Sequence, residues 1–183
     1  MKLNWNEIAD LEVLESPSNV DERGFLRVIY DHGMNKTGMH IKDFLVQRLI
    51  MVSNNRGTIR GIHKAKKDIN EIKLVSCISG RVREVLVDLR PESTTFKKHA
   101  EIILNSSDDK SIVIPSGFGQ AYEVLSDEAT LIYAINTSYS PSKELFINAL
   151  DPELNIEWGN FKHRSEKDLA ARDVSILLSQ GLI

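Results

Sequence analysis

The run RGTIRGIHKAKK places a histidine, His63, at the end of a short apolar segment and among cations. If this segment is a strand, the imidazole is expected to face the interior of a small barrel. Neighbouring positive charges favour the neutral form of an imidazole, which is the form that a general base needs. A surface or capping histidine on a basic loop is the alternative that the local sequence leaves open. The cations are Arg60, Lys64, Lys66, Lys67 and Lys73.

Three further polar side chains could carry chemistry. Lys73 alternates with Val75 and Cys77 in EIKLVSCIS, so it shares their face of a strand, and a lysine on the inner face needs an anionic partner or ligand. The other register would place it outside. Tyr133 in TLIYAI fits a buried ring whose hydroxyl must find a partner, or simply a core tyrosine. Asp168 in RSEKDLAARD fits a carboxylate at a helix start, and nothing local marks it as catalytic.

Motifs for metals and phosphates are missing from the sequence. The histidines form no HxH or HExxH pair, and the single cysteine lies near none of them. Gly117 and Gly119 in PSGFGQ lack the Lys-Ser/Thr of a phosphate-binding loop, so a turn that opens a strand explains them better. We therefore expect no bound metal and no phosphate loop.

Length and composition define the class of protein. The chain has 183 residues, 42% of them hydrophobic and 27% charged, which is typical of one soluble globular domain. The net charge of −3 with mixed signs argues against nucleic acid or a membrane as the main partner. The lone Cys77 fits a reducing compartment, and no apolar run resembles a membrane span or a signal peptide. A cytoplasmic location is expected.

The elements that must position these side chains are mostly short strands. Residues 72–79 and 81–89 flank Gly80, which predicts a hairpin turn there. Together the strands predict an antiparallel sandwich or barrel. Residues 173–180 predict a helix with Asp173 as N-cap and Gly181 as stop, a short helical turn is possible around 38–43, and the last ~25 residues are expected to wrap the barrel. The other predicted strands cover residues 25–30, 44–53, 100–105, 111–115, 120–125 and 130–135.

Taken together, the segments resemble the dTDP-4-dehydrorhamnose 3,5-epimerase family, the RmlC-like branch of the cupins. The motifs D-x-R-G-F-F, R-G-L-H and I-P-x-G-F-A-H-G-F-x-x-L-S of that family have counterparts here in the same order. The matching segments are DERGFLRVIY (21–30), RGIH (60–63), KLVSCISGRVREVLVDLRPESTTF (73–96), IPSGFGQAYEVLS (114–126), LIYAINTSYSPSKE (131–144), LDPELNIEW (150–158) and SEKD (165–168).

The resemblance implies an all-β fold, a small antiparallel β-barrel or jelly roll with short peripheral helices, as a single cupin domain over residues 1–183. It implies a homodimer with exchanged N-terminal strands and no metal or organic cofactor. The implied activity is epimerisation at C3, C5 or both of a nucleotide-linked 4-keto-6-deoxy sugar. Protons next to the C4 ketone are removed and then returned from the opposite face.

The resemblance also implies the site. His63 matches the family's base, Asp168 its orienting carboxylate, Tyr133 the opposite-face acid and Lys73, with Arg60 nearby, the cation that stabilises the enolate. A tyrosine stays protonated at neutral pH and is therefore able to donate. Arg23 and Phe25 match an exchanged strand that reaches the neighbour's nucleotide. The remaining binding positions are Gln47, which needs a one-residue shift, Arg60, Gln120, Tyr139, Glu144 and Lys167.

Several positions depart from the family pattern. Gln120 stands for a histidine, Val28 for a glutamate, and Lys64-Ala65 for a Tyr-Gln pair, while LIMV (49–52) replaces a polar stretch. The proton-transfer residues match while the substrate lining differs, and we expect these differences to alter which substrate fits. Two alternatives stay open, a 4-keto sugar isomerase and a non-catalytic cupin that binds a sugar nucleotide or a partner protein.

Overall fold

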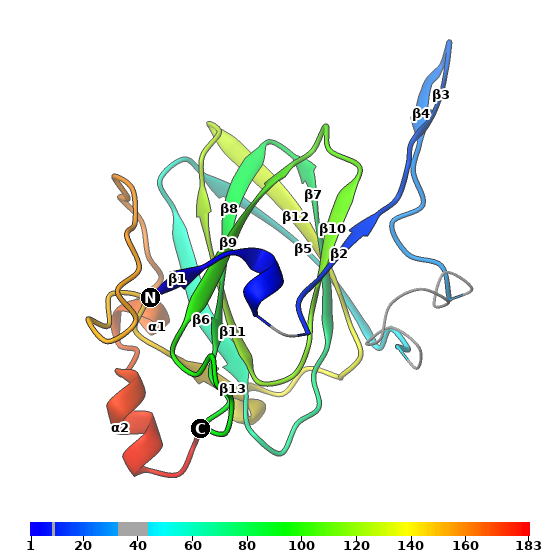
Figure 1. Cartoon of the computed structure of the whole chain (residues 1–183). Helices are drawn as coiled ribbons and strands as arrows, with labels where there is room; N and C mark the ends of the chain where they lie inside the picture. The colour runs from blue at the N-terminus through cyan, green and yellow to red at the C-terminus, as the bar shows by residue number, and fades with distance from the viewer. Residues whose placement is uncertain (9, 33–43) are drawn as a thin grey trace.

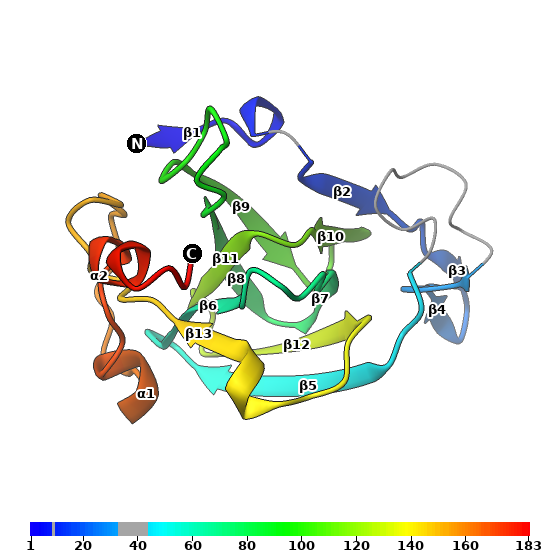
Figure 2. The ribbon, with the colours of Figure 1, turned by 90° about the horizontal axis from the view of Figure 1, so that it is seen from below.

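Alternating apolar and polar residues build two β-sheets that face one another (Figures 1 and 2), in a computed structural model that describes residues 1–8, 10–32 and 44–183. The six-stranded sheet has the order β1 (Lys2–Leu3), β9 (His99–Asn105), β8 (Arg81–Asp88), β11 (Phe118–Val124), β6 (Ile59–Ala65) and β13 (Glu144–Phe146). The five-stranded sheet has the order β2 (Glu12–Glu15), β10 (Lys110–Ile114), β7 (Lys73–Ser79), β12 (Glu128–Ile135) and β5 (Arg48–Asn55).

All strand pairs in these sheets are antiparallel except β1 with β9. The core lies between the sheets and is built from the inward residues of each strand. It includes Val75, Leu86, Ile112, Tyr122 and Leu131, all at most 1% exposed. This confirms the predicted all-β, cupin-like fold.

The predicted hairpin at Gly80 is wrong. β7 pairs with β10 and β12 in one sheet, whereas β8 pairs with β9 and β11 in the other, so Gly80 connects the two sheets. Gly80 has a φ of +73°, and an added Cβ would lie 2.1 Å from the carbonyl oxygen of Glu128. Glycine is therefore required where the chain crosses from sheet to sheet.

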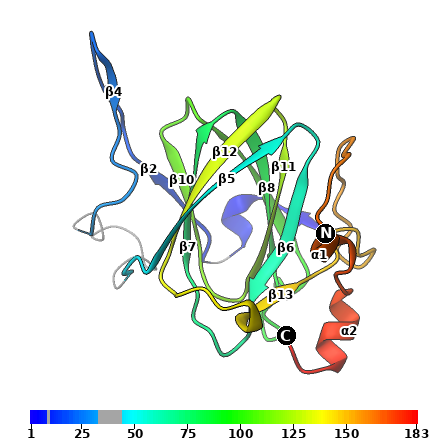
Figure 3. The same ribbon diagram turned by 180° about the vertical axis from the view of Figure 1, so that it is seen from behind.

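Only the first part of the strand predicted over residues 25–30 forms. β3 (Asn19–Asp21) and β4 (Gly24–Leu26) make a hairpin that extends away from the barrel (Figures 1 and 3). After β4, side-chain hydrogen bonds attach the chain to the rest of the protein. Arg27 donates to the carbonyl oxygen of Asp108, and the Tyr30 hydroxyl donates to the carbonyl oxygen of Phe44. The strand predicted from residue 44 begins at Arg48 instead. The possible turn around 38–43 lies outside the described residues.

The C-terminal residues pack against the outside of the six-stranded sheet. The predicted helix is confirmed as α2 (Val174–Ser179), although the Asp173 carboxylate accepts from Asn148 rather than capping α2. Val174 and Leu177 are buried in a second core cluster on this side. The short elements η1 (Trp5–Glu7), η3 (Pro141–Lys143) and α1 (Glu166–Leu169) complete the description. None of the helices in the described ranges has the length and apolar character of a membrane span.

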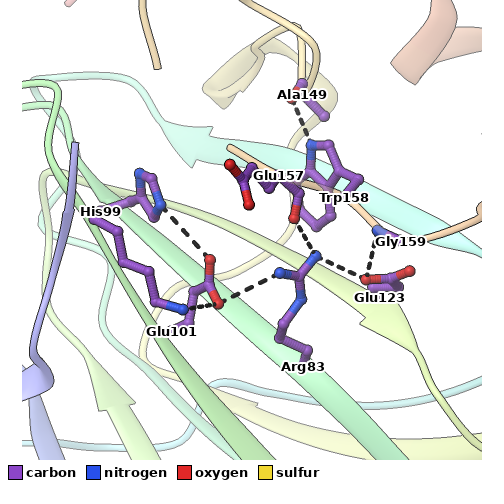
Figure 4. Close-up of polar contacts among 9 residues, drawn as sticks. Arg83, His99, Glu101, Glu123, Ala149, Glu157, Trp158 and Gly159 are labelled. Atoms are coloured by element: carbon purple, nitrogen blue, oxygen red, sulfur yellow. Dashed lines mark hydrogen bonds and ion pairs between the residues drawn. The ribbon is translucent and has the colours of Figure 1, made fainter. Parts of the chain in front are cut away.

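A polar cluster on the outer face of the six-stranded sheet fixes the start of this C-terminal segment (Figure 4). The Arg83 guanidinium donates to the Glu123 carboxylate and to the Glu157 carbonyl oxygen, at 2.8 Å in both cases. Trp158 Nε1 donates to the Ala149 carbonyl oxygen at 2.7 Å. These contacts direct the chain toward β6, where the Ile59 amide donates to the carbonyl oxygen of His163.

Candidate active site

A cavity of about 830 Å³ opens between the two sheets. Its walls come from the inward faces of β5, β6, β11 and β12, and its rim from segments 137–144 and 163–168. The four side chains that sequence analysis selected for chemistry all line it: His63, Lys73, Tyr133 and Asp168.

His63 and Asp168 form a dyad although 105 residues separate them. His63 Nε2 lies 2.7 Å from Asp168 Oδ1. Burial alone would raise the pKa of Asp168, but hydrogen bonds from His63, from Ser165 and from the Gly61 backbone lower it below its usual range. Because an ionised carboxylate only accepts, Nε2 carries the proton and the lone pair lies on Nδ1. In this arrangement Nδ1 can accept a proton, and the buried carboxylate is placed to stabilise the imidazolium that results.

The local sequence explains how Asp168 is held. Ser165 caps α1, its hydroxyl accepts from the Asp168 amide at 3.1 Å, and it donates to Asp168 Oδ2 at 2.8 Å. Arg164 donates to the Asp168 carbonyl oxygen at 2.6 Å. On the other side of the imidazole, Phe146 contacts the ring edge-on with centroids 4.8 Å apart. Backbone and packing together fix the orientation of the dyad.

Lys73 is held at the base of the cavity by two acceptors. Its Nζ donates to Gln120 Oε1 at 3.4 Å and lies 3.6 Å from Glu71 Oε1. Gln120 Nε2 in turn donates to Glu84 Oε2 at 3.1 Å. These two hydrogen bonds orient the side-chain amide of Gln120 with its oxygen toward Lys73. The ammonium group of Lys73 therefore stays directed into the cavity.

Glu84, which is fully buried, was not identified from the sequence. Burial raises its pKa to about 8, although the Gln120 hydrogen bond and the Lys73 charge act in the opposite direction. The carboxyl is therefore mainly protonated at neutral pH. Its alternation with Val82 and Leu86 in RVREVLVDL was a signal that it faces inward.

Tyr133 approaches the cavity from the sheet opposite His63. It lies on β12, between Ile50 of β5 and Val75 of β7, and is 8% exposed. Burial is the main reason that its pKa lies well above the usual range, and Tyr122 and Glu84 would raise it further where they are ionised. The phenol therefore stays protonated and available as a donor. A base and an acid on facing sheets suit proton transfer to opposite faces of one bound molecule.

The other predicted binding residues fall into two groups. Arg60, Gln120, Tyr139, Glu144 and Lys167 line the cavity. Arg23 and Phe25 lie on the β3–β4 hairpin, outside the cavity lining of their own chain, and Arg23 pairs there with Asp21. Gln47 is exposed and outside the lining as well.

Arg48, next to Gln47, does line the cavity and was not identified from the sequence. Its guanidinium lies 5.2 Å from the ring centroid of Tyr139 and 3.5 Å from Glu71 Oε2. A cation beside an exposed aromatic ring suits a planar, charged ligand. The alternation of residues 48–55 puts Arg48, Ile50, Val52 and Asn54 on the inward face of β5.

The sequence and the fold are both similar to those of known proteins. A family model described as dTDP-4-dehydrorhamnose 3,5-epimerase matches residues 6–175. The enzyme of that name from Mycobacterium tuberculosis is 31% identical over 170 residues, which cover 90% of this chain and 83% of the relative.

Two solved structures are similar over nearly the whole chain. RmlC from Legionella pneumophila, in complex with dTDP-4-keto-L-rhamnose, has a TM-score of 0.87 and 29% identity, covering 96% of this chain and 94% of its own. ChmJ, a 3'-monoepimerase from Streptomyces bikiniensis in complex with dTDP-quinovose, has a TM-score of 0.90 and 27% identity, covering 99% and 92%.

Proposed function

Because the chain belongs to the dTDP-4-dehydrorhamnose 3,5-epimerase family, we propose that it inverts C3, C5 or both of a nucleotide-linked 4-keto-6-deoxy sugar. The observation that carries this proposal is the pairing of the His63–Asp168 dyad on one sheet with Tyr133 on the facing sheet, around one cavity. Inversion needs a base and an acid on opposite faces of the sugar, and this arrangement supplies both.

The first step removes a proton from carbon. His63 Nδ1 takes the proton from the carbon next to the C4 ketone, and the negative charge moves to the ketone oxygen. Asp168 stabilises the imidazolium that results, because its carboxylate stays ionised at 2.7 Å from Nε2. Lys73 provides the positive charge for the enolate oxygen, and Arg60 lines the same cavity.

The second step returns a proton from the other face. Tyr133 donates its phenolic proton to the same carbon, which inverts the centre and re-forms the ketone. His63 releases its extra proton to water and Tyr133 regains one, so the reaction is neutral overall. We propose that Tyr139 and Arg48 bind the nucleotide base, and that Lys167 binds charged groups of the ligand.

We also propose a homodimer in which the β3–β4 hairpin reaches the cavity of the neighbouring protomer. The hairpin exposes Val20, Phe25 and Leu26, with Phe25 67% exposed. β5, at the edge of its sheet, exposes Leu49 and Met51, the latter at 70%. Apolar surface of this extent around an open sheet edge suits an interface with a second copy. Arg23 and Phe25 then belong to the partner's site.

Mixing two inactive variants tests this assembly. Arg23→Ala and His63→Ala proteins should each be strongly impaired alone. After subunit exchange, about one quarter of all sites should be intact, because each shared site takes one residue from each protomer. The measurement is activity of the mixture over time, with native mass spectrometry to verify exchange. Mixed dimers without recovered activity, or a fully active monomer at micromolar concentration, would contradict the shared site.

Deuterium exchange tests the function itself. In D₂O the protein is expected to introduce deuterium next to the C4 ketone of a nucleotide-linked 4-keto-6-deoxy sugar, followed by NMR at C3–H and C5–H. We expect the dTDP-linked sugar to react slowly or at one carbon only, because Gln120, Ile50 and Val52 change the lining that must accommodate both ring forms. The similar structures include a 3,5-epimerase and a 3'-monoepimerase, so they are compatible with inversion at one carbon or at both.

The dTDP-, CDP- and GDP-linked sugars are compared side by side. Rapid exchange at both carbons of the dTDP sugar would show that the altered lining has little effect on the reaction. No exchange with any of the three would overturn the epimerase proposal and favour the isomerase or binding-module alternatives.

A further inference from the structure

Tyr122 places a second phenol beside Tyr133 in the cavity. It lies on β11, is 1% exposed, and lines the cavity between Arg60 of β6 and Glu84 of β8. In the motif G-F-A-H-G-F the corresponding position is a phenylalanine, whereas this chain reads GFGQAY. The ring can fill the core without its hydroxyl, so the hydroxyl needs a separate explanation.

Two hydrogen bonds join three side chains in a row. The phenol of Tyr133 lies within side-chain hydrogen-bonding reach of the Tyr122 hydroxyl, with Tyr133 as the donor, and burial raises the pKa of both groups. The Tyr122 hydroxyl donates to Asn54 Oδ1 at 2.6 Å. Asn54 is half-buried on β5 and also lines the cavity, next to the exposed Asn55. The row therefore leads from the buried acid to a wetter edge of the cavity.

The proposed reaction creates a difficulty that this row addresses. When Tyr133 has given its proton to carbon, it is left as a phenolate inside a buried site. Burial disfavours that anion, while the positive charge of Arg60 favours it. A donor close to the phenolate oxygen lowers its free energy as it forms, and a path to water must return the proton.

We propose that Tyr122, oriented by Asn54, stabilises the Tyr133 phenolate and returns a proton to it, so that Tyr122 is a positioning residue for the acid of the reaction. This inference rests on the proposed epimerase function. In the step, the Tyr122 O–H bond breaks as the Tyr133 O–H bond forms, and Tyr122 then takes a proton from cavity water. His63 releases the abstracted proton to water, so charge and atoms balance. The Asn54 amide has both acceptor and donor groups. By rotating its side-chain amide it can accept a hydrogen bond from the Tyr122 hydroxyl or donate one to it.

Tyr122→Phe tests this proposal through the ratio of inversion to exchange, which a change in packing alone would not alter. The variant keeps the ring, so Tyr133 becomes a weaker acid while the His63–Asp168 dyad is untouched. Substrate in D₂O should still lose its proton to His63 at nearly the wild-type rate. More of the enolate should then be reprotonated by His63 without inversion. We expect the ratio of inversion to exchange to fall about tenfold.

Matched variants complete the experiment. Asn54→Leu should lower the same ratio, and the double variant should be no worse than Tyr122→Phe alone, because the two residues act in one row. Tyr30→Phe removes a hydroxyl that donates to the Phe44 carbonyl oxygen, outside the cavity lining, and should leave the ratio unchanged.

The outcomes separate the two proposals. Two results would overturn the inference and make the role of Tyr122 structural. Either Tyr122→Phe and Asn54→Leu reduce the exchange and inversion rates equally, or they change neither rate. If the wild-type protein itself neither exchanges nor inverts, the proposed function fails first. Thermal unfolding of each variant verifies that it is folded before its ratio is compared.

Discussion

Replacing His63 by alanine is expected to reduce epimerisation at least about 10³-fold, while the fold and nucleotide binding stay nearly unchanged. The proton next to the ketone then has no base within reach, since Asp168 is buried behind the imidazole and its pKa is lowered. The deuterium exchange rate reports the same step without relying on inversion, so both rates should fall together.

Asp168→Asn gives the matched comparison for this variant. It leaves the imidazole in place but removes the charge that stabilises the imidazolium, so a loss of about 10- to 100-fold is expected. His32→Ala, outside the cavity lining, controls for removal of a histidine. Exchange at the wild-type rate in His63→Ala would exclude His63 as the base.

Replacing Lys73 by methionine is expected to lower kcat by about 10²- to 10³-fold with a much smaller change in KM. Methionine keeps most of the volume and removes the charge, so the enolate oxygen loses the cation that faces it. The charge matters more in the transition state than in the bound ketone, which is why kcat should change most. Rates at saturating substrate and calorimetric binding of the nucleotide sugar separate the two effects.

The structure offers a control for the Lys73 variant. Lys67 is exposed on the loop after β6 and outside the cavity lining, so Lys67→Met should retain wild-type kcat and KM. If Lys73→Met instead raises KM and leaves kcat unchanged, Lys73 binds the substrate uniformly and another group must stabilise the enolate. Arg60 is the first alternative because it lines the same cavity.

Alternation of apolar and polar residues predicted most of the strands and their inward faces, because it is a local property of a half-buried strand. It indicated a buried Tyr133, left the register of Lys73 open between the inward and outward faces, and predicted the C-terminal helix over 173–180, which forms as Val174–Ser179. The resemblance supplied Asp168 and the family. Glu84 and Arg48 were within reach of the same alternation argument but were not identified.

The pairing of the strands and the contacts between distant side chains could not be predicted from the sequence. Local alternation looks the same for a hairpin and for a crossing between sheets, so Gly80 was assigned to the wrong connection. The contact of His63 with Asp168 spans 105 residues, and the row from Tyr133 through Tyr122 to Asn54 joins strands of both sheets. Such contacts depend on how two sheets close over a common core, which no single segment of the sequence specifies.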